Sequence, residues 1–344
     1  MAHEVESMFF AGEVPWHGLG TAVPAEVTAA EAIKLAGLDW EVAMSPLYTS
    51  FNKGGVDVQT WVDQDEYQGV VRTSDGSVLG VVGSQYKPIQ NATAFSFFDG
   101  IVGEGKAIYH TAGSLKGGKR IWILAKLPGD LVVANSDVVQ KFLLLSTSHD
   151  GSMTLGMQLT PVRVVCANTL NVALRGQSER ISIRHTANAD ERIAEAMRAV
   201  KLANDFYAAF NEKANLLAAA RFSPAMMTEL VTRLFPVKGK DADETKIPAQ
   251  LQTKRAEVVR LFDEGLGHDK IAGTAWAAVN AVAEYVDHHA KRRGDIEQAR
   301  DSRLFHLWYG NSVDIKQRAL EIVDDQISKQ NDRGVIVVPS SFSA

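Results

Sequence analysis

The residues of this chain whose types and spacing could do chemistry gather between Leu143 and Ala173. Polar side chains surround an Asp-Gly turn in that segment: Ser146, Ser148, His149, Asp150 and Ser152. Arg163, Cys166 and Asn168 follow after one further apolar run. The segment therefore holds a candidate general base, carboxylate and nucleophile close together in the sequence.

Consecutive Ser148, His149 and Asp150 are the residue types of a catalytic triad. Adjacent residues in a strand or turn point in different directions, so these three side chains are not expected to form the hydrogen-bonded relay of a triad. Ser146 or Cys166 could still reach His149 in three dimensions. Cys166 lies in an apolar run, which favours a place in the core over a reactive thiol.

A metal-assisted hydrolase is the second chemistry that we consider. His149, Asp150 and Asn168 could form its site, together with Asp287 or His288 of a later helix. Asn280 and Glu284 precede Asp287 and His288 at helical spacing, so all four share one face. That face lacks the second histidine of an HExxH motif, and a solvated or helix-capping polar face is the favoured interpretation.

Nucleic-acid binding is the third chemistry. Basic residues are frequent from Lys116 to Arg184, and a Gly117-Gly118 turn carries several of them. Such residues can contact phosphates, while aromatic residues such as Tyr109 and Trp122 could stack on bases. The candidate phosphate-binding residues are Lys116, Lys119, Arg120, Arg163, Arg175, Arg180 and Arg184. A plain solvated hairpin tip remains the alternative for the glycine turn.

Charge is distributed unevenly over the 344 residues. Residues 1–103 hold 4 basic and 13 acidic residues, residues 104–201 hold 13 and 8, and the rest of the chain is close to neutral. A basic middle segment can attract a polyanion although the whole chain has a net charge of -5, because local potential governs such binding. The single cysteine cannot form an internal disulfide, and no stretch reaches the ~20 apolar residues of a membrane helix. We therefore expect a cytoplasmic protein without membrane contact.

The elements that position these residues predict an α+β fold. Short β-prone runs from Trp40 onward are separated by the turn pairs Gly54-Gly55, Asp75-Gly76, Gly117-Gly118 and Asp150-Gly151, which indicates an antiparallel sheet of hairpins with short helices. Residues 167–174 are expected to be helical. From Ala187 the chain shows helical spacing, with a helix start at Ser223-Pro224. We expect a β-rich region over 1–186, a helical region over 187–344 packed on it, and a charged linker near 237–247.

Several motifs resemble one known family. They are PWHGLGT (15–21), STSHDGS (146–152), PVRVVCANTL (161–170), NAVAEYVDH (280–288) and WYGNS (308–312). They are similar to the phage and plasmid-like family of the domain of unknown function DUF932. This resemblance implies a gene of a phage, plasmid or integrated element. It identifies no catalytic residues, and the cofactor stays unknown.

The function expected from these observations is that of a mobile-element protein of DNA metabolism. It would bind or anneal single-stranded DNA and, by analogy at fold level with annealing proteins, form a homo-oligomer. The alternatives are the metal-assisted hydrolase, acting on nucleotide or nucleic acid, and an interaction protein that blunts host defence through its acidic first segment. The sequence leaves open whether the protein is an enzyme and which cofactor it would use.

Overall fold

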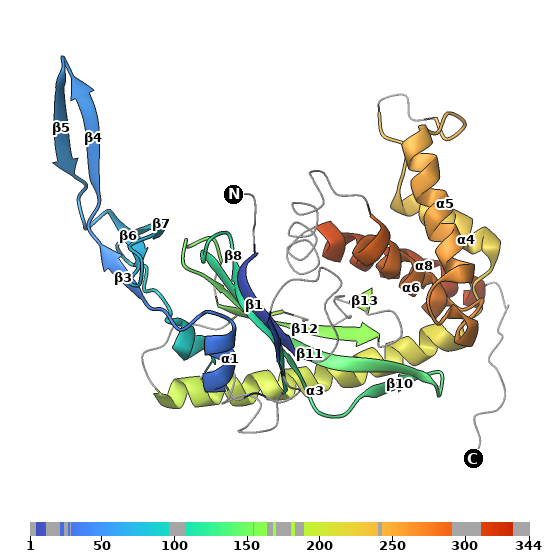
Figure 1. Ribbon diagram of the computed structural model, residues 1–344. Coiled ribbons are helices and arrows are strands. Elements are labelled where there is room, and N and C mark those ends of the chain that lie inside the picture. The colour runs from blue at the N-terminus through green and yellow to red at the C-terminus, as the bar shows by residue number, and fades with distance from the viewer. Residues whose placement is uncertain are drawn as a thin grey trace. The chain divides into compact units, whose positions relative to one another are not determined.

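The structure is a computed structural model. It describes residues 5–11, 21–23, 27, 29–95, 108–153, 155–163, 168–169, 180–182, 189–239, 243–290 and 311–332. The described part has the expected α+β content, with antiparallel sheets of hairpins, short helices and a mostly helical C-terminal region (Figure 1).

The chain forms two compact units, and each unit is built from three segments. The first unit comprises residues 1–128, 142–159 and 180–203, and the second comprises residues 129–141, 160–179 and 204–344. Two long strands and one long helix begin in one unit and end in the other. The predicted division into regions 1–186 and 187–344 stays a prediction, because compactness and independent folding are different properties.

The largest sheet that the described residues form has nine strands. Their order is β13-β12-β11-β9-β8-β1-β2, with β10 beside β11 and β14 beside β12. The bounds of these strands are Val5–Ala11 (β1), Thr21–Val23 (β2), Ile108–Leu115 (β8), Arg120–Lys126 (β9), Leu131–Val133 (β10), Asp137–Ser148 (β11), Gly156–Arg163 (β12), Asn168–Thr169 (β13) and Arg180–Ser182 (β14). Where the register of neighbouring strands is described, the pairs are antiparallel except for the parallel pair β1 and β2.

Two smaller sheets belong to the first unit. Strands β3 (Val42–Ser45), β6 (Tyr67–Arg72) and β7 (Val78–Gly83) form one, and β4 (Tyr48–Lys53) and β5 (Val56–Trp61) form a separate hairpin. Helix α1 spans Ala29–Leu35, and Gly37 follows it with a φ of 63°. The predicted hairpin turns at Gly54-Gly55, Asp75-Gly76 and Gly117-Gly118 are confirmed, because glycine accepts the positive φ that such turns need.

Two helices begin at the capping residues from which the sequence predicted their start. Helix α3 is one continuous helix over Ala189–Ala219, and Ser223 caps α4 (Pro224–Leu234) by accepting a hydrogen bond from the backbone N–H of Met226. Thr274 caps α6 (Ala275–Glu284) in the same way. The remaining elements are α5 (Ala249–Glu264), the short 3-10 helix η1 (His268–Lys270), the π-helical turn η2 (Tyr285–His289) and α8 (Asn311–Asp332).

One local prediction is wrong. Asn168 and Thr169, expected at the start of a helix, form strand β13, where Thr169 lies opposite Val162 and Asn168 opposite Arg163 of β12. The edge of β12 supplies backbone hydrogen-bonding partners at that point, and pairing with it overrides the helical preference of the run. The rest of the predicted helix lies outside the described residues.

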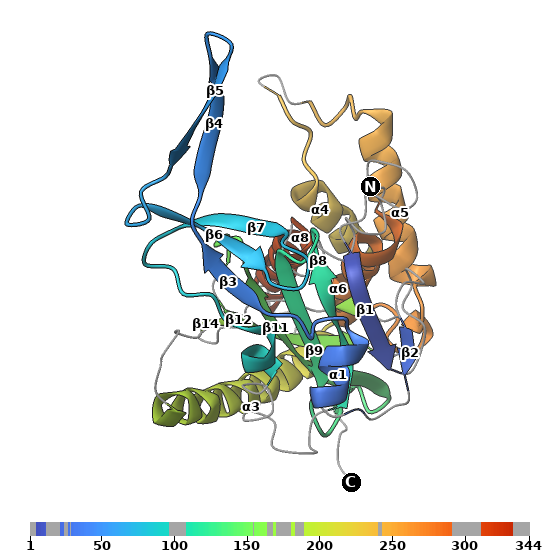
Figure 2. The ribbon, with the colours of Figure 1, turned by 60° about the vertical axis from the view of Figure 1, so that its left-hand side comes forward.

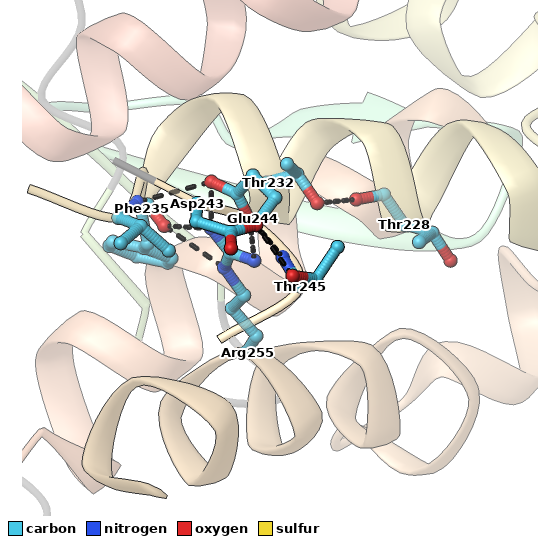
Figure 3. A network of polar contacts seen from close by, with 8 residues as sticks. Thr228, Thr232, Phe235, Asp243, Glu244, Thr245 and Arg255 are labelled. Atoms are coloured by element: carbon cyan, nitrogen blue, oxygen red, sulfur yellow. Dashed lines mark hydrogen bonds and ion pairs between the residues drawn. The ribbon is translucent and has the colours of Figure 1, made fainter. Parts of the chain in front are cut away.

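The charged loop at 237–247, predicted as a linker, is fastened to the second unit by Arg255 of α5 (Figure 3). Two guanidinium nitrogens of Arg255 donate to Glu244 Oε2 and Oε1 at 2.7 and 3.0 Å. Its Nε and Nη2 also donate to the carbonyl oxygen of Phe235 at 2.9 and 2.6 Å. The hydrogen bonds from Arg255 hold the pKa of Glu244 below its ordinary value. The described part of the loop is thus an anchored segment within one unit.

We expect Arg255→Ala to lower the free energy of unfolding by about 2–3 kcal/mol, because a buried guanidinium with four hydrogen bonds is lost and the Phe235 carbonyl loses its donors. Urea unfolding followed by circular dichroism measures this loss, and trypsin should cut the freed loop faster at Lys238 or Lys246. Arg260→Ala is the matched control, since the exposed Arg260 binds Glu257 and Glu264 at the surface and its removal should leave the free energy of unfolding nearly unchanged. Equal losses for the two variants would contradict the anchoring role.

Within the described residues, no helix combines the length and the apolar character needed to span a membrane.

Candidate nucleic-acid interface

Two turns that are distant in the sequence lie side by side in the first unit. One joins β8 to β9 and carries Lys116 and Lys119, and the other joins β11 to β12 and carries His149. Arg120 lies opposite Ser148 in the pairing of β9 with β11, and the backbone N–H of His149 donates to the carbonyl of Lys119 at 2.8 Å. The sheet therefore brings part of the predicted phosphate-binding set to the predicted hairpin tip.

Arg180 belongs to strand β14, which pairs with the first residues of β12, close to the β11–β12 turn. In the pairing of β12 with β14, Ser182 lies opposite Gly156, at the start of β12, and Arg180 lies opposite Gln158. Arg163 lies at the other end of β12, opposite Asn168. Arg175 and Arg184 lie outside the described residues. Of the predicted basic set, Lys116, Lys119 and Arg120 meet at the two turns.

The side chain of His149 is buried, with 1% of its surface exposed. Its Nε2 lies 3.0 Å from Oδ1 of Asn91, and the amide nitrogen of Asn91 donates to the carbonyls of Leu38 and Trp40. Because the Asn91 oxygen is the acceptor in this network, His149 is the Nε2–H tautomer. Burial lowers the pKa of His149 to about 4, so the imidazole is neutral at pH 7.

Trp40 packs against the His149 imidazole, and Arg72 packs against Trp40. The Trp40 ring lies 5.3 Å from the imidazole, centroid to centroid, and the guanidinium carbon of Arg72 lies 4.6 Å from the centre of the Trp40 ring. Arg72 also donates to the carbonyl of Gly117 at 2.7 Å. The guanidinium of Arg72, at the end of β6, thus contacts the β8–β9 turn that carries Lys116 and Lys119. No spacing pattern in the sequence links Trp40, Arg72 or Asn91 to His149, so sequence reasoning missed them.

The hydrogen bonds of the tip confirm that Ser148, His149 and Asp150 form no relay. The Ser148 hydroxyl donates to the carbonyl of Met153 and accepts from its N–H, and a carboxylate oxygen of Asp150 accepts from the N–H of Ser152. Burial works to raise the pKa of Asp150, but hydrogen bonds from Ser152 and Ser148 and the charge of Arg120 hold it below the ordinary value. The carboxylate therefore stays ionised and engaged with its own turn.

Close packing fixes the tip against β7. A Cβ atom at Gly80 would lie 2.5 Å from the Cα atom of Asp150, so only glycine allows this approach without a backbone shift. The hydroxyl of Tyr86, which follows β7 in the chain, also donates to the carbonyl of Ser148 at 2.7 Å. The tip is consequently a rigid, packed turn rather than a free loop.

The two aromatic residues proposed for base stacking do not serve that purpose. Tyr109 and Trp122 are both buried in the sheet, and Tyr109 stacks on Phe95. Apolar positions of β8 and β9 face the core, so these rings fill space there. Contacts with a nucleic acid at the two turns would have to come from cations and backbone groups.

The polar stripe of α6 and η2 is buried and not solvated as predicted. Asn280, Glu284 and Asp287 are at most 3% exposed, and the Asp287 carboxylate binds Lys316 of α8 at 2.6 Å. Glu284 Oε2 accepts from the backbone N–H of Leu266 at 3.2 Å. The periodicity of one helix cannot show that a second helix covers its polar face.

His149 and Asp150 belong to the first unit, whereas Asp287 and His288 belong to the second, so their convergence in one pocket stays a prediction. In the part of the chain that the structure describes, no group of three or more His, Cys, Asp and Glu side chains is placed to hold a metal ion.

The family model described as Domain of unknown function (DUF932) matches residues 78–308, which is more than half of the chain. This chain belongs to the DUF932 family. The matched residues include β7, both turns of the candidate site and α6, whereas the β4–β5 hairpin precedes them. No curated protein and no solved structure matches the chain. Membership of the DUF932 family confirms the resemblance and assigns no activity to the site.

Proposed function

We propose that the two adjoining turns of the first unit bind the phosphate backbone of single-stranded nucleic acid. The observation that supports this function is the position of the β8–β9 turn, which carries Lys116, Lys119 and Arg120 and lies directly beside the β11–β12 turn, where the His149 N–H donates to the Lys119 carbonyl. The turn between Lys116 and Arg120 also holds the exposed Gly117, where an added Cβ atom would meet nothing within 4 Å, so an anion can come close to the backbone at this residue.

The neutral state of His149 fits a binding role better than proton transfer from this side chain. Its imidazole is buried, bound to Asn91 and unprotonated above about pH 4. A general base near neutral pH needs an accessible group that titrates in that range. The expected role of His149 is to hold the tip of β11 in place while the cations beside it make the contacts.

The phage and plasmid context implied by the resemblance suggests the biological setting. A protein of DNA metabolism in a mobile element would meet single strands during replication and recombination, and annealing them would require several copies of the chain. Cytoplasmic location and homo-oligomer formation belong to this proposal. The metal-assisted hydrolase and the host-defence interaction protein stay alternatives, and the π-helical turn at Asp287 and His288 favours the first of them, because such turns often occur at functional sites.

Oligonucleotide binding at varied salt tests the proposal. Three phosphate contacts on a single strand give a log–log salt slope of about -2, so affinity should fall roughly 20-fold between 50 and 200 mM salt. Fluorescence anisotropy with a labelled oligothymidine measures this slope. The triple variant Lys116→Gln, Lys119→Gln, Arg120→Gln should bring the slope close to zero while keeping polar side chains at the turns.

The matched control removes three exposed lysines from the second unit by Lys238→Gln, Lys246→Gln and Lys270→Gln. It changes the net charge of the chain equally, because each triple removes three positive charges. We expect the control to bind as the unaltered chain does. Absence of binding at low salt, or equal loss in both triple variants, would overturn the proposed interface.

A further inference from the structure

The hairpin of β4 and β5 is a two-stranded arm that pairs with no other strand that the structure describes. Figure 1 and Figure 2 both show it extending from the sheet of β3, β6 and β7. Every residue of the two strands is exposed except Val58, which is half-buried. A hairpin in isolation is marginally stable in water, so this arm lacks the packing that usually supports two strands.

The arm exposes large apolar side chains. The exposed fractions are 57% for Tyr48, 52% for Phe51, 65% for Val56 and 70% for Trp61. Among the residues that the structure describes, neither edge of the hairpin pairs with a further strand, the register runs without a bulge, and neither strand contains proline. Proteins commonly protect open edges with bulges, prolines or charges, and exposed apolar surface marks sites of association. The arm is therefore a surface built to receive another strand.

The register divides the arm into two faces. Tyr48 packs edge-on against Trp61 at 5.6 Å, and Asn52 donates to Asp57 at 2.9 Å, so these pairs share one face. The residues of the opposite face, which we call the arm face, are Thr49, Phe51, Lys53, Val56, Val58 and Thr60. The arm face is apolar at its centre, where Phe51 lies opposite Val58, and it ends in the pair Thr49 and Thr60 on one side and in Lys53 beside Val56 on the other.

We propose that β5 pairs antiparallel with β5 of a second copy of this chain, with Val58 at the two-fold axis. An axis perpendicular to the sheet places opposite residues on the same face, so Val58 meets Val58 of the second copy and Val56 meets Thr60. On the other face, Asp57 meets Gln59. The one carboxylate of β5 thus faces a neutral amide, and no like charges oppose each other.

This pairing turns two exposed hairpins into one four-stranded sheet. A row of Phe51, Val58, Val58 and Phe51 crosses the middle of the combined arm face, and the open edge of β5 gains backbone partners. β-branched residues such as valine and threonine are well suited to these positions. The self-complementary order of β5 is what selects a second copy over the strand of an unrelated protein.

The expected dimer is weak and depends on concentration. Six residues span about 20 Å, and the area that two such arms can bury is well below the ~800 Å² per partner of a standard stable interface. We therefore expect dissociation in the micromolar range. The inference deepens the homo-oligomer formation of the proposed function, but it does not depend on the nucleic-acid interface, because the arm and the two turns share no residues.

Sedimentation velocity on the full chain with designed charges tests the pairing. Val58→Asp places two carboxylates opposite each other and should raise the dissociation constant at least about tenfold, and Val58→Lys should do the same with two ammonium groups. An equimolar mixture of the two variants should associate again, because opposite charges then meet. Ser50→Asp on β4 adds the same charge away from the pairing edge and should leave association unchanged.

Disulfide cross-linking tests the contact between the two Val58 residues independently. In a Cys166→Ser background, Val58→Cys should form a covalent dimer on mild oxidation, whereas Ser50→Cys should not. A chain that stays monomeric up to about 100 μM, or Asp and Lys variants that do not re-associate when mixed, would overturn the proposal. Association that Val58→Asp leaves intact would assign the contact to another surface or partner.

Discussion

Replacing Lys316 with methionine is expected to lower the free energy of unfolding by about 3–5 kcal/mol. Lys316 of α8 and Asp287 of η2 form an ion pair at 2.6 Å, and their side chains are 2% and 1% exposed. Methionine has a similar length and an apolar character, so it fills much of the same space. The large loss arises because Asp287 would stay buried after losing the positive charge of Lys316.

Two comparison variants separate the ion pair from packing. Lys316→Met combined with Asp287→Leu removes both charges and should recover most of the loss, since an apolar pair of similar volume often replaces a buried ion pair without cost. Lys329→Met breaks the exposed pair with Asp325 on α8 and should leave the free energy of unfolding nearly unchanged. Urea unfolding followed at 222 nm measures all three changes. A Lys316→Met loss no larger than that of Lys329→Met would contradict the structural role of the pair.

Stability should decrease by about 3 kcal/mol between pH 6.5 and pH 4 through His149 alone. Burial lowers the pKa of His149 in the folded chain to about 4, whereas in the unfolded chain it has its ordinary value near 6.5. As pH falls below 6.5, the unfolded state binds a proton that the folded state does not bind. The contribution of His149 to stability is therefore complete above pH 6.5 and is lost progressively toward pH 4.

His149→Gln isolates this effect from the carboxylates that titrate over the same range. Glutamine keeps an N–H donor for Asn91 and has no ionisable group, so the variant should lack the His149 contribution to the pH dependence. The quantity to measure is the difference in unfolding free energy between the two proteins at each pH. That difference should shift by about 3 kcal/mol in favour of the variant as pH falls, and a flat difference would refute the buried neutral state of His149.

The local elements of the fold were predictable because their signals lie within a few residues. Gly54-Gly55 and Asp75-Gly76 reverse the chain at positive φ, and Ser223 and Thr274 cap the helices that follow them. The antiparallel hairpins, the long helix α3 and the order of β-rich and helical segments followed from the same short-range patterns. Propensity and capping act along the chain, so the amino-acid order is enough to read them.

The candidate site was predictable only in part. The sequence indicated that the tip with His149 and the basic turn with Lys119 were both notable, but their contact depends on the pairing of β9 with β11. It gave no sign that Asn91, 58 residues before His149, would bind the imidazole. It also misplaced Trp122, whose apolar strand turned out to face the core.

For this DUF932 chain, composition and short-range pattern established the α+β class, the turns, most helix boundaries and the location of the basic residues. Burial and pairing came from contacts between distant segments: Lys316 neutralises Asp287, Arg255 fastens the loop at Glu244, and Asn91 fixes His149. From the sequence alone, Asp287, Glu244 and His149 are interpreted as solvated or reactive residues. In the fold, each of them forms a contact that stabilises the structure. The physical reason is that the free energy of a buried charge or hydrogen bond depends on its partner, and the partner is chosen by the fold and not by the neighbouring residues.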